Sequence, residues 1–121
     1  MDISGTVSIR KKDGNTGDPL AGAEFTLYQW SKKSKAYVTL KKLTYDGQKR
    51  TYNSGKFNYT EDNQGKFRVR ETKSPPNYTG NWQKNFTLDK PGEKQEFLFE
   101  AVNYQTEKRR IEVRKIDAKN R

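Results

Sequence analysis

Short runs in which apolar and polar residues alternate make up most of this 121-residue chain, and they predict an all-β fold. In a strand, side chains two positions apart lie on the same face of the sheet. No segment shows a convincing helical period, and turns rich in Gly, Pro, Asn and Asp separate the runs. We therefore expect a β-sandwich of about seven strands. The expected strands are 6–12, 23–30, 36–44, 56–59, 66–72, 83–88 and 95–103.

The alternation also predicts where side chains point. In the second run, Phe25 and Leu27 are expected to face the core. Their neighbours are expected to face outward: Glu24, Thr26 and Tyr28. The segment 45–52 is polar and poorly patterned, so we expect an exposed hairpin or loop there.

Composition excludes several classes of function. The chain has no cysteine and no histidine, which removes disulfides, thiol chemistry, the commonest metal ligand and the commonest general base. We therefore expect no metal and no cofactor, and an enzyme with turnover is the least expected function. Only 30% of the residues are hydrophobic, so the folded state should be marginal unless something besides the core stabilises it.

The formal net charge of +10 suggests a nucleic-acid partner, but the distribution of charge argues against one. Basic residues are spread along the chain and interleaved with acids, and only Lys108, Arg109 and Arg110 form a compact run. We expect solvated strand faces and no nucleic-acid binding. No stretch reaches the roughly 18 to 20 apolar residues of a membrane span, so no membrane insertion is expected.

Three of the alternating runs end their apolar face on a reactive polar residue. Val7 and Ile9 lead to Lys11, Phe67 and Val69 lead to Glu71, and Phe97, Phe99 and Ala101 lead to Asn103. Each polar group shares a face with its apolar neighbours and should point into the core. Burying an unpaired charge costs several kcal/mol or more, so such groups are usually paired or neutralised. If the three groups meet, the amine can attack the amide, release ammonia and join two strands covalently.

The C-terminal segment repeats the pattern of the first strand. Residues 110–117 read RIEVRKID and residues 6–13 read TVSIRKKD, which places Lys115 at the position of Lys11. A basic strand can give this pattern by chance, but the shared Lys-x-Asp ending favours a repeat, and repeats at domain-sized spacing indicate an array. We therefore expect one β-sandwich domain at 1–106, and at 107–121 a linker with the first strand of a following repeat.

Taken in order, these segments resemble the B-type repeat of Gram-positive collagen adhesins (the Cna-B domain), which is also found in pilins of the same bacteria. The resemblance covers residues 5–103 and rests on five blocks: GTVSIRKKD, TGDPLAGAEFTLY, SGKFNY, GKFRVRETKSPPNY and FLFEAVN. It implies an immunoglobulin-like, prealbumin-like sandwich that serves as a secreted, wall-attached stalk module. The polar, extended region 45–62 departs from the commoner form of the family, which weakens the match for the middle strands but not for Lys11, Glu71 and Asn103.

The resemblance further implies an autocatalytic isopeptide bond between a first-strand Lys and a last-strand Asn, assisted by a Glu. By motif position these are Lys11, Asn103 and Glu71. An apolar site favours the neutral, nucleophilic amine of Lys11. We expect Glu71 to be a neutral acid there, to donate to the Asn103 carbonyl oxygen and then to pass a proton to the departing ammonia. The plainer alternatives are a surface lysine, an ordinary salt bridge and an asparagine that caps a strand end.

Two functions of different classes follow. The first is a structural spacer of a cell-wall adhesin or pilus on a Gram-positive bacterium, whose partners are adjacent repeats of the same chain. The second is a ligand-binding domain for a host matrix protein, such as collagen, or for a carbohydrate. Trp30, Trp82 and the seven Tyr residues would supply its binding face, although such rings more often cover sheets and their edges.

Overall fold

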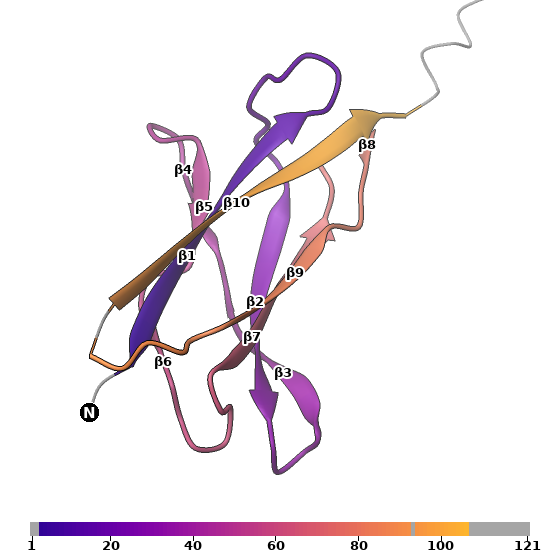
Figure 1. The fold of residues 1–121 in the computed structure, drawn as a ribbon. Coiled ribbons are helices and arrows are strands. Elements are labelled where there is room, and N and C mark those ends of the chain that lie inside the picture. Colours follow the sequence, from indigo (N-terminus) through magenta and orange to yellow (C-terminus); the bar gives the residue numbers. More distant parts are fainter. Residues whose placement is uncertain (1–2, 93, 107–121) are drawn as a thin grey trace, which may run out of the picture.

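The computed structural model describes residues 3–92 and 94–106, and it has two sheets and no helix in this part of the chain (Figure 1). One sheet has the order β4-β5-β1-β10-β8, with β6 also paired to β1, and the other has the order β3-β2-β7-β9. The expected β-sandwich is thereby confirmed. The strands are β1 (Ser4–Asp13), β2 (Glu24–Ser31), β3 (Ala36–Lys42), β4 (Thr44–Asp46), β5 (Thr51–Asn53), β6 (Phe57–Asn58), β7 (Lys66–Lys73), β8 (Tyr78–Thr79), β9 (Gln83–Thr87) and β10 (Lys94–Gln105).

The long strands lie where the alternation predicts them, and the differences fall in the middle of the chain. The single strand expected at 36–44 is divided into β3 and β4 by Leu43, whose side chain is buried and whose N–H donates to the carbonyl of Phe25 at 2.9 Å. The two-residue strand β8 was not expected. The segment expected to open a following repeat, 107–121, lies outside the described residues.

The expected hairpin at 45–52 exists and residues 45–50 are exposed or half-buried as predicted, but its last two residues, Thr51 and Tyr52, are buried. β4 and β5 form an antiparallel pair, and Tyr52 on β5 is only 2% exposed. The reason is tertiary: β5 pairs with β1, and Tyr52 lies opposite Ile9 in that pair, so its ring joins the inward face of β1. The ring packs against Phe25, with 4.9 Å between centroids. A polar neighbourhood in sequence therefore contains a core residue.

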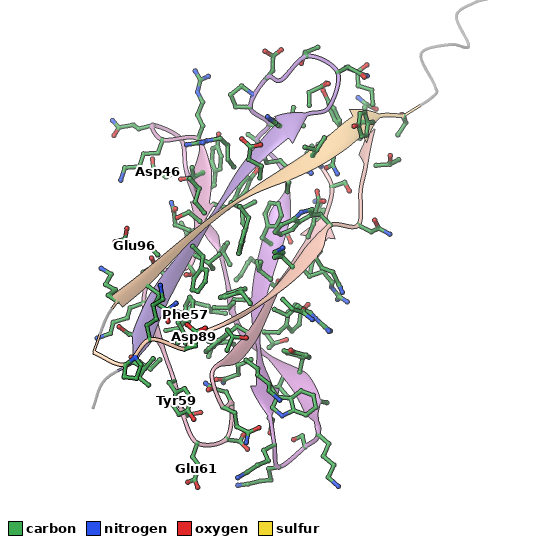
Figure 2. The ribbon with its side chains drawn as sticks, in the orientation of Figure 1. Asp46, Phe57, Tyr59, Glu61, Asp89 and Glu96 are labelled. Carbon is green, nitrogen blue, oxygen red and sulfur yellow. The ribbon has the colours of Figure 1, made fainter. Side chains whose placement is uncertain are left out.

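The core fills the space between the sheets, and the outward face of β2 is partly covered. Phe25 and Leu27 are fully buried, as expected. Thr26 was expected to face outward but is also buried, and its hydroxyl oxygen lies 3.5 Å from that of Thr72. Figure 2 shows the side chain of Phe57 among those between the sheets. The buried apolar residues are Val7, Ile9, Ala23, Phe25, Leu27, Leu43, Tyr52, Phe57, Phe67, Val69, Phe86, Leu88 and Ala101.

The first and last strands, β1 and β10, lie side by side and run parallel. Their pairing runs from Ser4 opposite Lys94 to Asp13 opposite Asn103. Parallel neighbours need a crossover connection, and here the crossover consists of all the intervening strands. The N-terminal end of β1 and the C-terminal end of β10 consequently lie at opposite ends of the sheet (Figure 1).

Candidate functional site

Three strands from both sheets bring Lys11, Glu71 and Asn103 together in the core. Lys11 continues the inward face of Val7 and Ile9 on β1, and Asn103 continues that of Ala101 on the neighbouring β10. Glu71 continues the inward face of β7 in the opposite sheet. The relative exposures are 0% for Lys11, 6% for Glu71 and 0% for Asn103. The alternation alone placed each of the three on the correct face.

Glu71 lies between the other two groups and contacts both. The Lys11 Nζ atom is 3.1 Å from Glu71 Oε2 and 3.3 Å from Oε1. The Asn103 Nδ2 group donates to the same Oε1 at 3.3 Å. Glu71 Oε1 therefore accepts hydrogen bonds from both the Lys11 amine and the Asn103 carboxamide. Lys11 is fully buried, so the alternative of a surface lysine is wrong.

The carboxamide is oriented differently from the expectation. We expected a protonated Glu71 to donate to the Asn103 carbonyl oxygen, but Glu71 faces Nδ2, and within the described residues Oδ1 has no hydrogen-bond partner. The physical reason is the ion pair: a carboxylate that neutralises an ammonium can only accept hydrogen bonds, so the amide turns its N–H side toward it. In this arrangement Glu71 contacts the carboxamide nitrogen and does not polarise the carboxamide oxygen.

Burial and pairing act on Lys11 in opposite directions. Desolvation in the core lowers the pKa of Lys11 below its ordinary value of 10.5, while the Coulombic attraction and hydrogen bond of Glu71 raise it. Desolvation is the larger effect, so the pKa of Lys11 is lowered overall. A lowered pKa makes the neutral, nucleophilic amine easier to reach near neutral pH.

A second buried carboxylate, Asp13, lies two residues beyond Lys11, and the sequence reasoning missed its role. Its Oδ2 accepts a 2.6 Å hydrogen bond from the Tyr78 hydroxyl, and its Oδ1 accepts from the N–H groups of Asn15 and Thr16. The Tyr78 hydroxyl and then these N–H groups lower the pKa of Asp13. Asp13 extends the Val7–Ile9–Lys11 alternation, and that signal was present in the sequence. Its partner Tyr78 could not be found from sequence spacing.

The main chain of Asn103 is held by the same turn. The Gly14 N–H donates to the Asn103 carbonyl at 2.8 Å, and Gly14 lies directly against the ring of Tyr104. Asn103 is thus fixed on its strand by β1 on one side and by the turn after β1 at its end. The Asn103 side chain is fully buried, and its Nδ2 group donates both to Glu71 and, at 3.2 Å, to the main-chain carbonyl of Val102, so it does more than cap a strand end.

Of the aromatic residues considered for a ligand face, both Trp residues pack against the protein, whereas Tyr45, Tyr59 and Tyr104 are exposed. Trp30 packs edge-on against Tyr37, with 5.3 Å between centroids, and the Arg68 guanidinium lies 4.1 Å from the centroid of Tyr37. Trp82 packs against Phe25 and Phe99 at the edge of the core. Cationic side chains thus lie over rings that a ligand would otherwise contact.

Two other kinds of site are absent from the described residues. These residues hold no group of three or more acidic side chains placed to bind a metal ion. They also hold no helix long and apolar enough to cross a membrane.

Comparison with known proteins adds a family and a fold. Residues 5–103 match the family described as the SpaA prealbumin-like fold domain. The structure is similar to the Bacillus anthracis TIE protein, with a TM-score of 0.61, 22% identity, and coverage of 85% of this chain and 17% of that chain. It is also similar to the full-length major pilin SpaD from Corynebacterium diphtheriae, with a TM-score of 0.59, 23% identity, and coverage of 84% and 30%. A search of curated proteins finds no match.

The similarities to solved structures establish the fold, whereas any chemistry must be inferred from the site residues themselves. The chain spans less than a third of the length of either protein. The same fold occurs in (S)-allantoin synthase, with a TM-score of 0.54, 11% identity, and coverage of 87% of this chain and 44% of that chain. A fold shared by a pilin and a synthase does not decide between structural and enzymatic roles.

Proposed function

Because this chain belongs to the family of SpaA prealbumin-like fold domains, we propose that it is a structural module in the stalk of a Gram-positive pilus or surface adhesin, stabilised by an isopeptide bond that it forms itself. The observation that carries the proposal is the buried contact of Lys11, Glu71 and Asn103, with Glu71 Oε1 3.3 Å from both nitrogens. Family membership supports the structural role, and the absence of histidine and cysteine from the chain supports a reaction that uses no external base or thiol.

In the proposed reaction, Glu71 first takes a proton from the Lys11 ammonium, which leaves a neutral amine and a neutral acid in an apolar site. The Nζ atom then attacks the Asn103 Cγ atom, and the Cγ–Nδ2 bond breaks. Two protons leave Nζ in all: one passes through Glu71 to Nδ2, which departs as ammonia, and the other stays on Glu71. One amide bond replaces another, and no oxidant or cofactor is needed.

The geometry supports Glu71 as the proton carrier. A general acid–base must lie within hydrogen-bonding reach of the group that loses the proton and of the group that gains it. Glu71 lies within 3.3 Å of both, from a single side-chain position. The reaction also removes a buried charge pair, because the product contains a neutral amide and a neutral acid, and isolated buried charges are costly.

The proposed surroundings of the module follow from the same role. In a stalk, its partners are adjacent repeats of the same chain or neighbouring subunits, and its location is the cell surface. The alternative, a domain that binds a host matrix protein or a carbohydrate, has less support. Trp30 and Tyr37 lie under cationic side chains and Trp82 packs at the core edge. The exposed rings are those of Tyr45, Tyr59 and Tyr104, and they come from separate parts of the chain.

Intact mass spectrometry tests the proposal directly. Folded wild-type protein should weigh one ammonia less than its sequence mass, and a proteolytic digest should contain a branched peptide that joins Lys11 to Asn103. Lys11→Met and Asn103→Ala should retain the full mass. Glu71→Gln should fold and also retain the full mass, since the proton carrier is lost.

Two outcomes would contradict this scheme. A well-folded wild-type protein with its full sequence mass would remove the bond. Complete bond formation in Glu71→Gln at the wild-type rate would show that another group carries the proton.

A further inference from the structure

Gly80 lies directly against the carboxamide of Asn103, in the link between β8 and β9. A Cβ atom placed on Gly80 would overlap Asn103 Nδ2, would lie 2.7 Å from Asn103 Cγ and 3.0 Å from Glu71 Oε1. The φ angle of Gly80 is outside the left-handed region, so its backbone does not require glycine. Glycine is required at position 80 because there is no room for a Cβ atom: real Cβ atoms essentially never approach other heavy atoms to under 3.0 Å.

From this geometry we propose that Gly80 is a positioning residue for cross-linking: the space left by its missing side chain is a notch that holds the departing nitrogen of Asn103 beside Glu71. This inference rests on the proposed function, because Gly80 can position the carboxamide for cross-linking only if the cross-link forms. Any side chain at position 80 would push the carboxamide away from the carboxyl group that must hand it a proton.

The notch is held in place from several directions. The Ser74 hydroxyl donates to the Gly80 carbonyl at 3.2 Å, and the Glu71 N–H donates to the Trp82 carbonyl at 2.8 Å. On the other side, β8 pairs with the end of β10, where Thr79 lies opposite Tyr104. The segment 74–82 is therefore attached to both strands that supply the carboxyl and the carboxamide.

The link from Tyr78 to Asp13 attaches the same segment to the third strand. The Tyr78 hydroxyl lies 2.6 Å from Asp13 Oδ2, and Asp13 lies two residues after Lys11 on β1. The segment 74–82 thus contacts β1, β7 and β10 close to the three reacting residues. It follows that the notch is complete only when these three strands have packed, so the bond should form after native packing.

The first experiment follows the intact mass of wild type, Gly80→Ala and Gly47→Ala from the time of cell-free synthesis, because a chain that has once folded would already carry the bond and keep it through unfolding. Gly47 is the matched control, because a Cβ there would meet only the Tyr45 ring at 3.9 Å, an ordinary contact. Displacing a reacting group by about 1 Å slows a reaction by about 100-fold, so Gly80→Ala should fold yet lose its ammonia about 100-fold more slowly than wild type. Gly47→Ala should react at the wild-type rate. A folded Gly80→Ala that reacts as fast as Gly47→Ala would overturn the proposal.

A second experiment measures the notch without the bond, in case Gly80→Ala prevents folding. All its variants carry Lys11→Met, which cannot cross-link. Within that background, Gly80→Ala should lower Tm while Asn103 is present and should have little further effect once Asn103 is alanine. The coupling in this double-mutant cycle reports the contact between the methyl group and the carboxamide. If Gly80→Ala lowered Tm equally in the presence and absence of the Asn103 carboxamide, the proposed role of the notch would be wrong.

The two experiments separate failure of the notch from failure of the proposed function. If wild type keeps its full mass, the cross-link is wrong, and the Lys11→Met cycle still decides whether Gly80 positions the carboxamide. If wild type loses ammonia and the cycle shows no coupling, the cross-link stands and the notch is wrong.

Discussion

Lys11 is the nucleophile of the proposed cross-link, and its surroundings make it unusual. It is fully buried and forms an ion pair with the Glu71 carboxylate. A buried ion pair adds little net stability, but removal of one partner typically costs about 3 to 5 kcal/mol because the other charge stays buried. The pair is therefore better explained as a reactive arrangement than as a device for stability.

The first prediction concerns the pH dependence of the unlinked protein. In Asn103→Ala, Lys11 stays titratable, and its folded-state pKa lies below the ordinary 10.5. Between the folded and the unfolded pKa the unfolded chain binds more protons than the folded chain, so the contribution of Lys11 to stability grows as the pH rises through this window. The free energy of unfolding of Asn103→Ala and of Asn103→Ala with Lys11→Met can be measured by urea titration from about pH 7 to about pH 10. As the pH rises, the variant that keeps Lys11 should gain stability relative to the variant with methionine. A shift in the opposite direction would mean that Glu71 dominates the pKa of Lys11.

Among the structural elements, the hairpin of β4 and β5 contributes more to the core than its sequence suggests. Tyr52 fills space beside Phe25, and its hydroxyl accepts from the Ala23 N–H at 3.2 Å and donates to the Leu20 carbonyl at 3.1 Å. The hairpin thereby fixes the segment that leads into β2. A short, polar hairpin has become part of the connection between the two sheets.

The second prediction tests this connection. Tyr52→Phe leaves the Ala23 N–H and the Leu20 carbonyl without their partner, and an unsatisfied buried polar group costs about 1 to 3 kcal/mol. The free energy of unfolding should fall by about that amount in denaturant titrations. Tyr45→Phe, on the neighbouring strand and 38% exposed, is the control and should change it by less than about 0.5 kcal/mol. Equal effects of the two substitutions would show that the hydroxyl of Tyr52 has no structural role.

The third prediction concerns the expected boundary after residue 106. If residues 107–121 open a following repeat, a chain that ends at Thr106 should keep its Tm and form the bond as completely as the full chain. Thermal unfolding and intact mass measure both. A clear loss of stability on truncation would show instead that the C-terminal segment completes a sheet of this domain.

For the whole molecule, the arrangement of the first and last strands decides how force would pass through it. β1 and β10 are parallel neighbours, and the chain enters and leaves at opposite ends of this pair (Figure 1). Tension applied to the two ends would pass along β1 to Lys11, across the proposed bond to Asn103 and out along the end of β10. The strands between them would carry none of it.

The fourth prediction concerns how much the proposed bond stabilises the folded protein. The bond would close about 92 residues of chain, and by analogy with a disulfide it would restrict the unfolded state by roughly 4 to 5 kcal/mol. Lys11→Ala should therefore lower Tm by at least about 10 °C and make the protein sensitive to proteases. Calorimetry and limited proteolysis provide the measurements.

Pulling on single molecules tests the mechanical role separately. Under end-to-end force, Lys11→Ala should extend by nearly its whole contour length, about 3.5 Å for each residue released, while wild type hardly extends. A wild-type protein that unravels as far as the variant would rule out the force-bearing role even if the bond forms.

The sequence by itself determined the long strands and the inward facing of the three candidate site residues. Period-two alternation places Lys11, Glu71 and Asn103 on inward faces, because a strand turns every second side chain to the same side. The same rule located β1, β2, β7, β9 and β10 and established the all-β class. These features depend on local geometry, which the order of residues specifies directly.

The tertiary structure decided which faces meet and what each polar atom contacts. The parallel pairing of β1 with β10, the burial of Tyr52, the hydrogen bond from Tyr78 to Asp13 and the fit of Gly80 against Asn103 all join residues far apart in the chain. The orientation of the Asn103 carboxamide was likewise set by the charge of Glu71, a residue of the other sheet. Such contacts depend on how two sheets pack in three dimensions, and no spacing within one strand encodes them.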